Sequence, residues 1–146
     1  MRYFTQEWWS GGCGDTAPID AYRAHFGSIR GSLPPSVVEF EERHTLHDSR
    51  IESVVASFSE ASVAFSLSGW DRSFSRQVHY SVLFLDVAMF EQHLPTGRDV
   101  ESELGDLGYW EYAIQPPRVE LRMLFASGAE FRVVFGDVRF TIQPPA

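Results

Sequence analysis

The chain has 146 residues with 12 basic and 20 acidic side chains, a formal net charge of −8 at pH 7. This length is typical of one domain, and a hydrophobic fraction of 44% is sufficient for a packed core. The acidic balance argues against nucleic acid and anionic membranes as partners, because phosphate groups are bound mainly by basic side chains.

The single cysteine, Cys13, excludes an intrachain disulfide and favours a reducing compartment. No segment reads as a secretory signal or has the apolar length of a membrane span. We therefore expect a cytoplasmic protein, and no motif indicates a cofactor.

Residues 1–14 predict an aromatic arm and a glycine-rich joint. Tyr3, Phe4, Trp8 and Trp9 should cover another part of the molecule, either as an edge strand or as a capping arm. The glycines that follow do not form a phosphate-binding motif, and the sequence shows no base that would activate Cys13.

Residues 15–45 predict two helices. Apolar residues recur at steps of three and four between Thr16 and Leu33, and Pro34 and Pro35 should end this first helix. Ser36 and Glu39 have the spacing of a capping box, which predicts a second, short helix that runs to about His44.

Residues 46–142 predict antiparallel strands, because apolar residues alternate and turn residues separate the runs. The expected strands are 51–58, 61–68, 78–84 (continuing toward Phe90), 109–114, 119–125, 131–135 and 138–142. The expected fold is a single α+β domain over residues 1–146. Its two N-terminal helices should pack on one face of a mostly antiparallel meander sheet of about six to seven strands.

His44, His47 and Asp48 stand where the helical pattern changes to the strand pattern. Imidazole and carboxylate groups at this spacing could bind a divalent metal, which would support a metal-assisted hydrolase. The alternative, which we favour, is that His47 and Asp48 hydrogen-bond the backbone at the junction of helix and strand.

The run from Asp86 to Glu111 contains seven acidic residues and one basic residue, Arg98. Such a run is either a solvated surface or a docking surface for a basic protein. The residues that we expect to bind such a partner are His47, Asp48, Asp99, Glu101, Glu103, Tyr109 and Glu111. The competing interpretation of the aromatic residues here is ordinary core packing.

Four stretches resemble a family of uncharacterised bacterial cytoplasmic proteins: MRYFT with its following tryptophans, LHDSRI, LGYWEYAI and LFASGAEFRVVFGDVRF. Members of that family have an aromatic N-terminus and a Leu/Phe-His-Asp motif before a β-rich half. A looser resemblance, through the His-Asp motif, is to immunity proteins of bacterial toxin systems. These resemblances imply an α+β fold and no particular reaction.

Taken together, the sequence favours a small acidic cytoplasmic protein that binds another protein, in the manner of an immunity protein, rather than an enzyme. The alternative function is the metal-assisted hydrolase that would use His44, His47 and Asp48.

Overall fold

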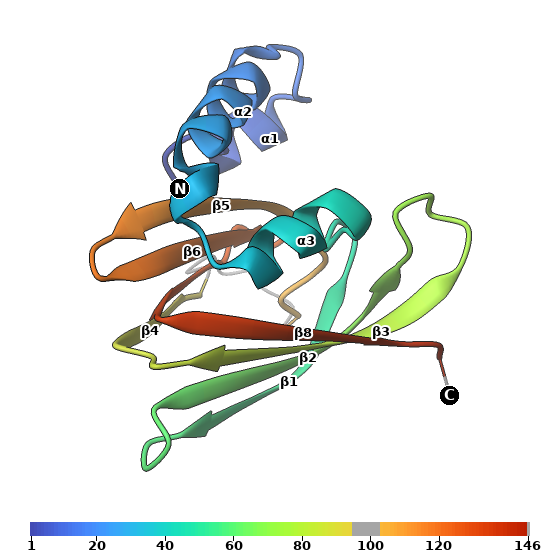
Figure 1. Ribbon diagram of the computed structural model, residues 1–146. Helices are drawn as coiled ribbons and strands as arrows, with labels where there is room; N and C mark the ends of the chain where they lie inside the picture. Colours follow the sequence, from blue (N-terminus) through green and yellow to red (C-terminus); the bar gives the residue numbers. More distant parts are fainter. Residues whose placement is uncertain (95–102, 146) are drawn as a thin grey trace.

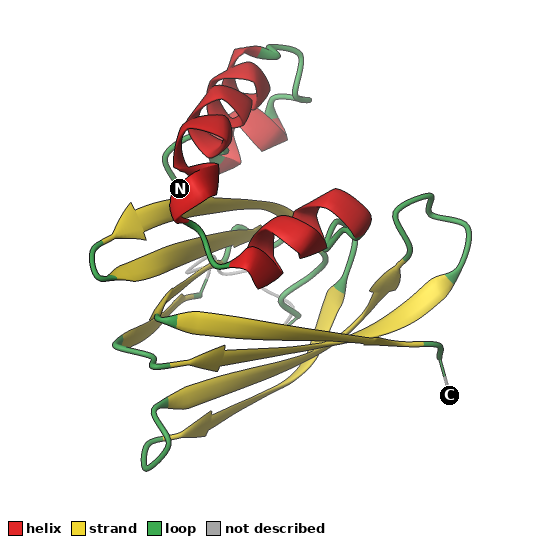
Figure 2. Cartoon of the chain, viewed as in Figure 1, coloured by secondary structure: helices red, strands yellow, loops and turns green. Residues whose placement is uncertain are grey.

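The computed structural model describes residues 1–94 and 103–145, which form an α+β fold with the helices at the N-terminus (Figures 1 and 2). The α-helices in this part of the chain are α1 (Gln6–Ser10), α2 (Ala17–Ile29) and α3 (Pro35–Arg43), with a short 3₁₀ turn at Arg30–Ser32 after α2. The strands are β1 (Arg50–Ser57), β2 (Ser62–Trp70), β3 (Gln77–Leu85), β4 (Met89–His93), β5 (Leu107–Gln115), β6 (Arg118–Phe125), β7 (Glu130–Phe135) and β8 (Asp137–Gln143).

The strands form two antiparallel sheets, in the orders β1-β2-β3-β8 and β4-β7-β6-β5. Phenylalanine rings join the sheets: Phe65 of β2 lies 6.4 Å from Phe131 of β7, and Phe84 of β3 lies 5.0 Å from Phe135. The α+β class and the helices at the N-terminus are thus confirmed. The single meander of six to seven strands is wrong, since each sheet covers the other.

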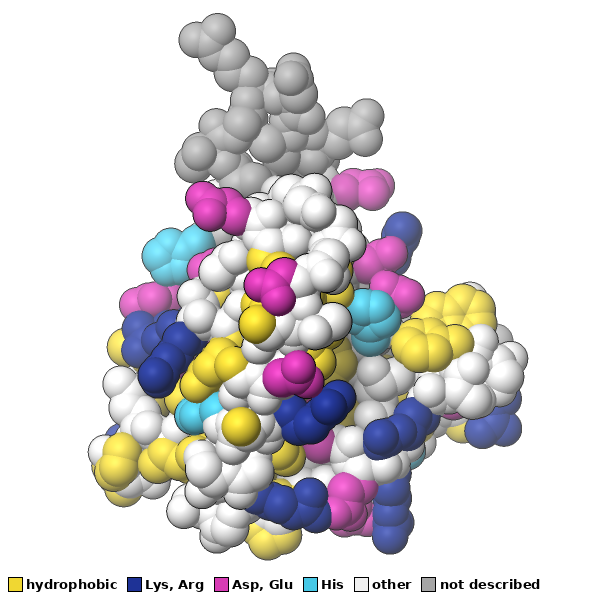
Figure 3. All heavy atoms as spheres, turned by 90° about the horizontal axis from the view of Figure 1, so that it is seen from above, with side chains coloured by type: hydrophobic (Ala, Val, Ile, Leu, Met, Phe, Trp, Pro, Cys, Tyr) yellow, Lys and Arg dark blue, Asp and Glu magenta, His cyan; other side chains and the backbone are white. Residues whose placement is uncertain are grey.

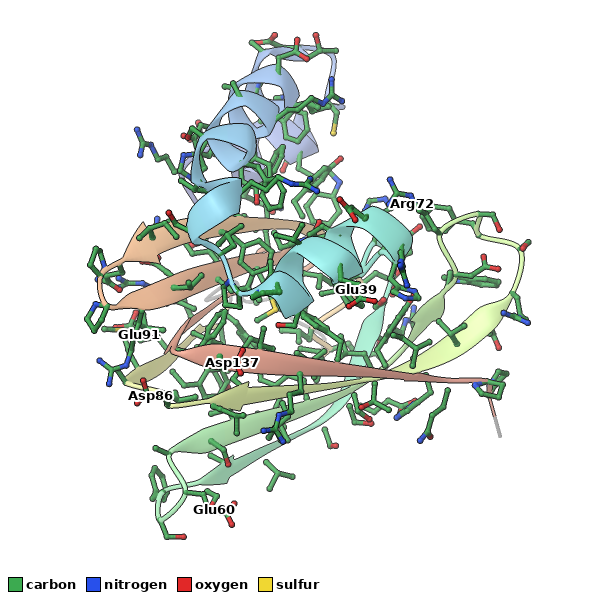
Figure 4. All side chains as sticks on the ribbon, in the orientation of Figure 1. Glu39, Glu60, Arg72, Asp86, Glu91 and Asp137 are labelled. Carbon is green, nitrogen blue, oxygen red and sulfur yellow. The ribbon has the colours of Figure 1, made fainter. Side chains whose placement is uncertain are left out.

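The split comes from two corners at which the chain changes sheets. The strand expected to continue toward Phe90 stops at Asp86, which has a φ of +51°, and β4 then pairs with β7. The amide of Gly136 donates to the carbonyl of Leu85 at 3.0 Å, where β7 gives way to β8. A Cβ at Gly136 would lie 2.5 Å from Asp86 Oδ2, so a side chain there would have to displace the side chain of Asp86. Figure 4 shows Asp86 and Asp137 at this same end of the molecule.

Helix α3 closes the side of the sandwich between β8 and β5, rather than lying on the open face of a sheet (Figure 1). Phe40 stacks on Phe140 of β8 at 4.2 Å, and the Trp110 indole of β5 donates to Glu41 at 2.8 Å. The predicted capping box is wrong: α3 begins at Pro35, whose fixed φ suits the first helical position, and Ser36 is already inside the helix.

The aromatic arm contains α1, so the edge-strand alternative for residues 1–9 is wrong and the capping-arm alternative agrees with the structure. Phe4 is 6% exposed, and Thr5 Oγ1 caps α1 by accepting from the Trp8 amide. Across residues 1–94 and 103–145, no helix combines the length and apolar character needed to cross a membrane.

Candidate functional site

The segment His47–Ser49 is bonded to the start of β5, an edge strand of its sheet. His47 Nδ1 lies 2.6 Å from the carbonyl oxygen of Gly108, and because a carbonyl only accepts, Nδ1 carries the hydrogen. The Asp48 amide donates to the Leu107 carbonyl at 2.9 Å, and the Leu107 amide donates to the Ser49 carbonyl at 2.8 Å. These backbone bonds agree with the structural alternative for His47 and Asp48.

The residues of the metal alternative have different surroundings. His44 lies at the end of α3 against Phe40 and Tyr80, with ring centroids 5.3 and 6.3 Å away. The His47 ring instead faces Tyr109 at 5.8 Å, and its Nε2 is 3.6 Å from Asp48 Oδ1. Within the part of the chain that the structure describes, no three His, Cys, Asp or Glu side chains are grouped so as to hold a metal ion.

Glu111, which we expected at a partner surface, is 4% exposed and faces the aromatic arm. Its carboxylate accepts hydrogen bonds from the amides of Arg2, Tyr3 and Phe4 at 2.8, 2.6 and 2.6 Å. Glu111 therefore holds the arm on the sheet and is not accessible to a partner in this structure.

Tyr109, the other expected contact residue of β5, packs inside the same arm. Its ring lies 5.0 Å from Phe4, 5.1 Å from Trp8 and 5.3 Å from Trp9. Burial, helped by the neighbouring thiol of Cys13, raises the pKa of the Tyr109 phenol to about 12. Gly108 permits this packing, because a Cβ there would lie 2.3 Å from the Trp9 ring.

The acidic run does not form one continuous acidic surface in the described residues. Asp86 pairs with Arg118 at 3.0 Å, Glu91 with Arg132 at 3.8 Å, and Asp106 with Arg50 at 2.6 Å. Figure 3 shows acidic and basic side chains interspersed on the face seen from above. Glu103 is exposed, whereas Asp99 and Glu101 lie outside the described residues.

Helix α2 covers the middle of the β5 edge with two side chains. The Tyr112 amide donates to the Tyr22 hydroxyl at 2.9 Å, and His25 Nε2 donates to the Tyr112 carbonyl at 2.9 Å. Side-chain groups thus replace a neighbouring strand along this edge, which protects it from pairing with another chain.

A cavity of about 250 Å³ opens on the β5 edge, between the part covered by His47 and the part covered by Tyr22. Glu41 of α3 lines it and accepts the Trp110 indole hydrogen bond. We call this cavity the aromatic pocket; its lining residues are Phe4, Tyr22, Glu41, His47, Gly108, Tyr109 and Trp110.

Burial raises the pKa of the Glu41 carboxyl from 4.5 to about 7, although the Trp110 indole and the charge of Arg72 oppose the rise. Arg72 lies beside the end of α3, where it donates to the Glu41 carbonyl at 2.8 Å (Figure 4). The pocket therefore combines aromatic walls with a carboxyl group that any nearby cation would drive toward its ionised form.

Sequence reasoning identified His47 and Tyr109 but missed Tyr22 and Glu41 as pocket residues. Tyr22 fits the apolar pattern at steps of three and four in α2, and Glu41 has no signal that distinguishes it from the neighbouring Glu39 and Glu42. Both reach the pocket from helices that are far from β5 in the sequence, so only the tertiary structure brings them together.

A second polar cluster lies on the outer face of the other sheet. Ser66 Oγ is 3.2 Å from His79 Nε2, and His79 Nδ1 is 3.6 Å from Glu52 Oε2. In a catalytic relay the imidazole lies between the hydroxyl and the carboxylate. Here Ser66 Oγ also lies 3.3 Å from Glu52 Oε2, so the imidazole is not placed between them.

Comparison of the chain with models of protein families and with curated protein sequences finds no match. The resemblances to the uncharacterised bacterial family and to immunity proteins therefore stay predictions.

Proposed function

We propose that this chain is a protein-binding module that captures a cationic group of a basic partner in the aromatic pocket. The observation that supports the proposal is the Glu41 carboxyl set among the rings of Phe4, Tyr22, Tyr109 and Trp110. An ammonium or guanidinium group is attracted to the faces of aromatic rings, most strongly by Trp, and pairs with a carboxylate.

The charge of the whole chain favours the same class of partner. A net charge of −8 attracts basic proteins over long distances and raises their rate of association at low salt. The exposed Glu103 can contribute to this attraction, whereas the buried Glu111 serves the fold.

Titration with n-butylammonium and methylguanidinium, followed through the indole resonance of Trp110, tests the proposal. Both cations should give saturable shifts, and n-butanol, a neutral compound of similar size, should bind much more weakly. Binding should weaken as salt is raised, because the attraction is electrostatic.

Glu41→Gln is the decisive variant, since the amide oxygen still accepts from the Trp110 indole while the charge is lost. Glu39→Gln is the matched control: it lies on the same helix, is exposed, and pairs only with Arg43 at 3.1 Å in the described residues. E41Q should abolish cation binding and E39Q should retain it. Equal binding of butanol and butylammonium, or full binding by E41Q, would contradict the proposal.

A further inference from the structure

Trp110 of β5 lines the aromatic pocket, and the pairing of the strand determines the direction of its backbone groups. The amide and carbonyl of Tyr112 point away from β6, because they bond to Tyr22 and His25 of α2. In an antiparallel strand, residues two apart direct their backbone groups to the same side. The pairing of β5 with β6 is regular from Tyr109 to Gln115, so Trp110 also directs its N–H and C=O away from β6.

The neighbouring positions on this edge are already occupied. His47 donates to the Gly108 carbonyl on one side of Trp110, and the Tyr22 hydroxyl accepts from the Tyr112 amide on the other. Both side chains also line the pocket, so the pocket spans the edge at Trp110. Among the described residues, no side chain bonds the Trp110 N–H or C=O, and the one bond made by its side chain uses the indole.

The pocket therefore presents four kinds of contact within a small space. They are a backbone acceptor, a backbone donor, a carboxyl group and aromatic faces. A volume of about 250 Å³ is at the small end for ligand sites, which limits the occupant to roughly one residue.

We infer, building on the proposed function, that the group captured in the pocket is a free α-amino acyl group, such as the amino terminus of a peptide. Its α-ammonium donates to the Trp110 carbonyl and to Glu41, and its own carbonyl accepts from the Trp110 amide. The occupant thus adds a single residue to the β5 edge, and its side chain lies against the rings. A lysine or arginine side chain carries the charge but lacks the carbonyl at the required position.

Three compounds, alanine amide, N-acetylalanine amide and n-butylammonium, separate the contributions of the ammonium group and of the carbonyl group to binding. Alanine amide should bind, the acetylated form should bind at least about tenfold more weakly, and n-butylammonium should fall several-fold below alanine amide. The Trp110 backbone amide should be protected from hydrogen exchange by alanine amide and not by n-butylammonium. E41Q should lose the preference for the free amine, while E39Q should keep it.

The outcomes of this experiment distinguish the inference from the proposed function. If n-butylammonium binds as tightly as alanine amide and both need Glu41, the inference is overturned and cation capture stands. If no cation binds, both are overturned.

A tetrapeptide amide with the sequence Ala-Gly-Gly-Gly and a free amino terminus identifies the source of the acyl group. Tighter binding than alanine amide supports a protein terminus. Equal binding supports a free amino-acid derivative and overturns the assignment to a peptide.

Discussion

Removal of the Glu111 charge should release the aromatic arm. In Glu111→Gln the side chain retains one carbonyl acceptor, and its NH₂ group meets backbone amides that also donate. The wild-type carboxylate is 4% exposed and accepts from three amides at 2.6 to 2.8 Å. No other single side chain in the described residues bonds the arm at three consecutive positions.

The magnitude follows from what the arm loses when it separates from the sheet. Each hydrogen bond to a buried charge contributes about 1.5–3 kcal/mol, but the released amides regain water, which recovers part of that energy. Exposing the Phe4 side chain costs a further 1.5–3 kcal/mol, roughly. We expect E111Q to lower the free energy of unfolding by about 3 kcal/mol, within the range for breaking a buried charged contact.

Urea denaturation measures this loss, and hydrogen exchange at the Tyr3 and Phe4 amides locates it. Glu60→Gln is the control, since Glu60 is exposed in the turn between β1 and β2 and should change stability by less than about 0.5 kcal/mol (Figure 4). A loss below about 1 kcal/mol, with both amides still protected, would refute the anchoring role of Glu111. Because Phe4 lines the aromatic pocket, E111Q should also weaken cation binding.

Three further predictions concern the pocket and the core. The pKa of Glu41 is raised from 4.5 to about 7 in the folded chain, so the contribution of the protonated carboxyl to stability is fully present below pH 4.5 and is lost as the pH rises to about 7. The free energy of unfolding, measured by urea denaturation, should therefore fall less between pH 5 and pH 8 for E41Q than for the wild type. The buried hydroxyl of Ser49 has no partner among the described residues, so Ser49→Ala should leave the melting temperature unchanged or raise it, and a clear fall would reveal a bond to water. Gly108→Ala should cost about 1–3 kcal/mol in urea denaturation, because the added Cβ meets the Trp9 ring at 2.3 Å; unchanged stability would show that Trp9 moves freely.

Local patterns in the sequence were enough to predict the strands at 51–58 and 61–68 and the short helix that ends near His44. The run from Ser62 to Ser68 alternates strictly, and the structure buries Val63, Phe65 and Leu67. Val37 and Phe40 are three residues apart and are the buried residues of α3. In both elements the apolar residues recur at the period of the backbone, every second residue in a strand and every three to four residues in a helix. This period alone determines which side chains point toward the core.

The division into two sheets depends on contacts that no local pattern records. Asp86 interrupts the alternation after Phe84, but the sequence does not show that Gly136, fifty residues later, will pack against it. The same holds for Glu111, whose partners are the first residues of the chain. In the sequence nothing distinguishes Glu111 from the other acidic residues between Asp86 and Glu111. It is buried because the aromatic arm packs over it.

The pocket and the protection of the β5 edge have the same physical origin. A neighbouring strand would hydrogen-bond every outward N–H and C=O group along β5. Side chains from separate segments hydrogen-bond only the backbone groups that they reach. His47 reaches Gly108 and Tyr22 reaches Tyr112, and no side chain of the described residues bonds the backbone N–H or C=O of Trp110 between them. An open pair exposed to water would have little consequence, but this one lies beside a carboxyl and among aromatic rings. Such surroundings make the hydrogen bonds of a cationic occupant stronger than they would be in water, which is why recognition is expected here and not at the exposed edge of β1.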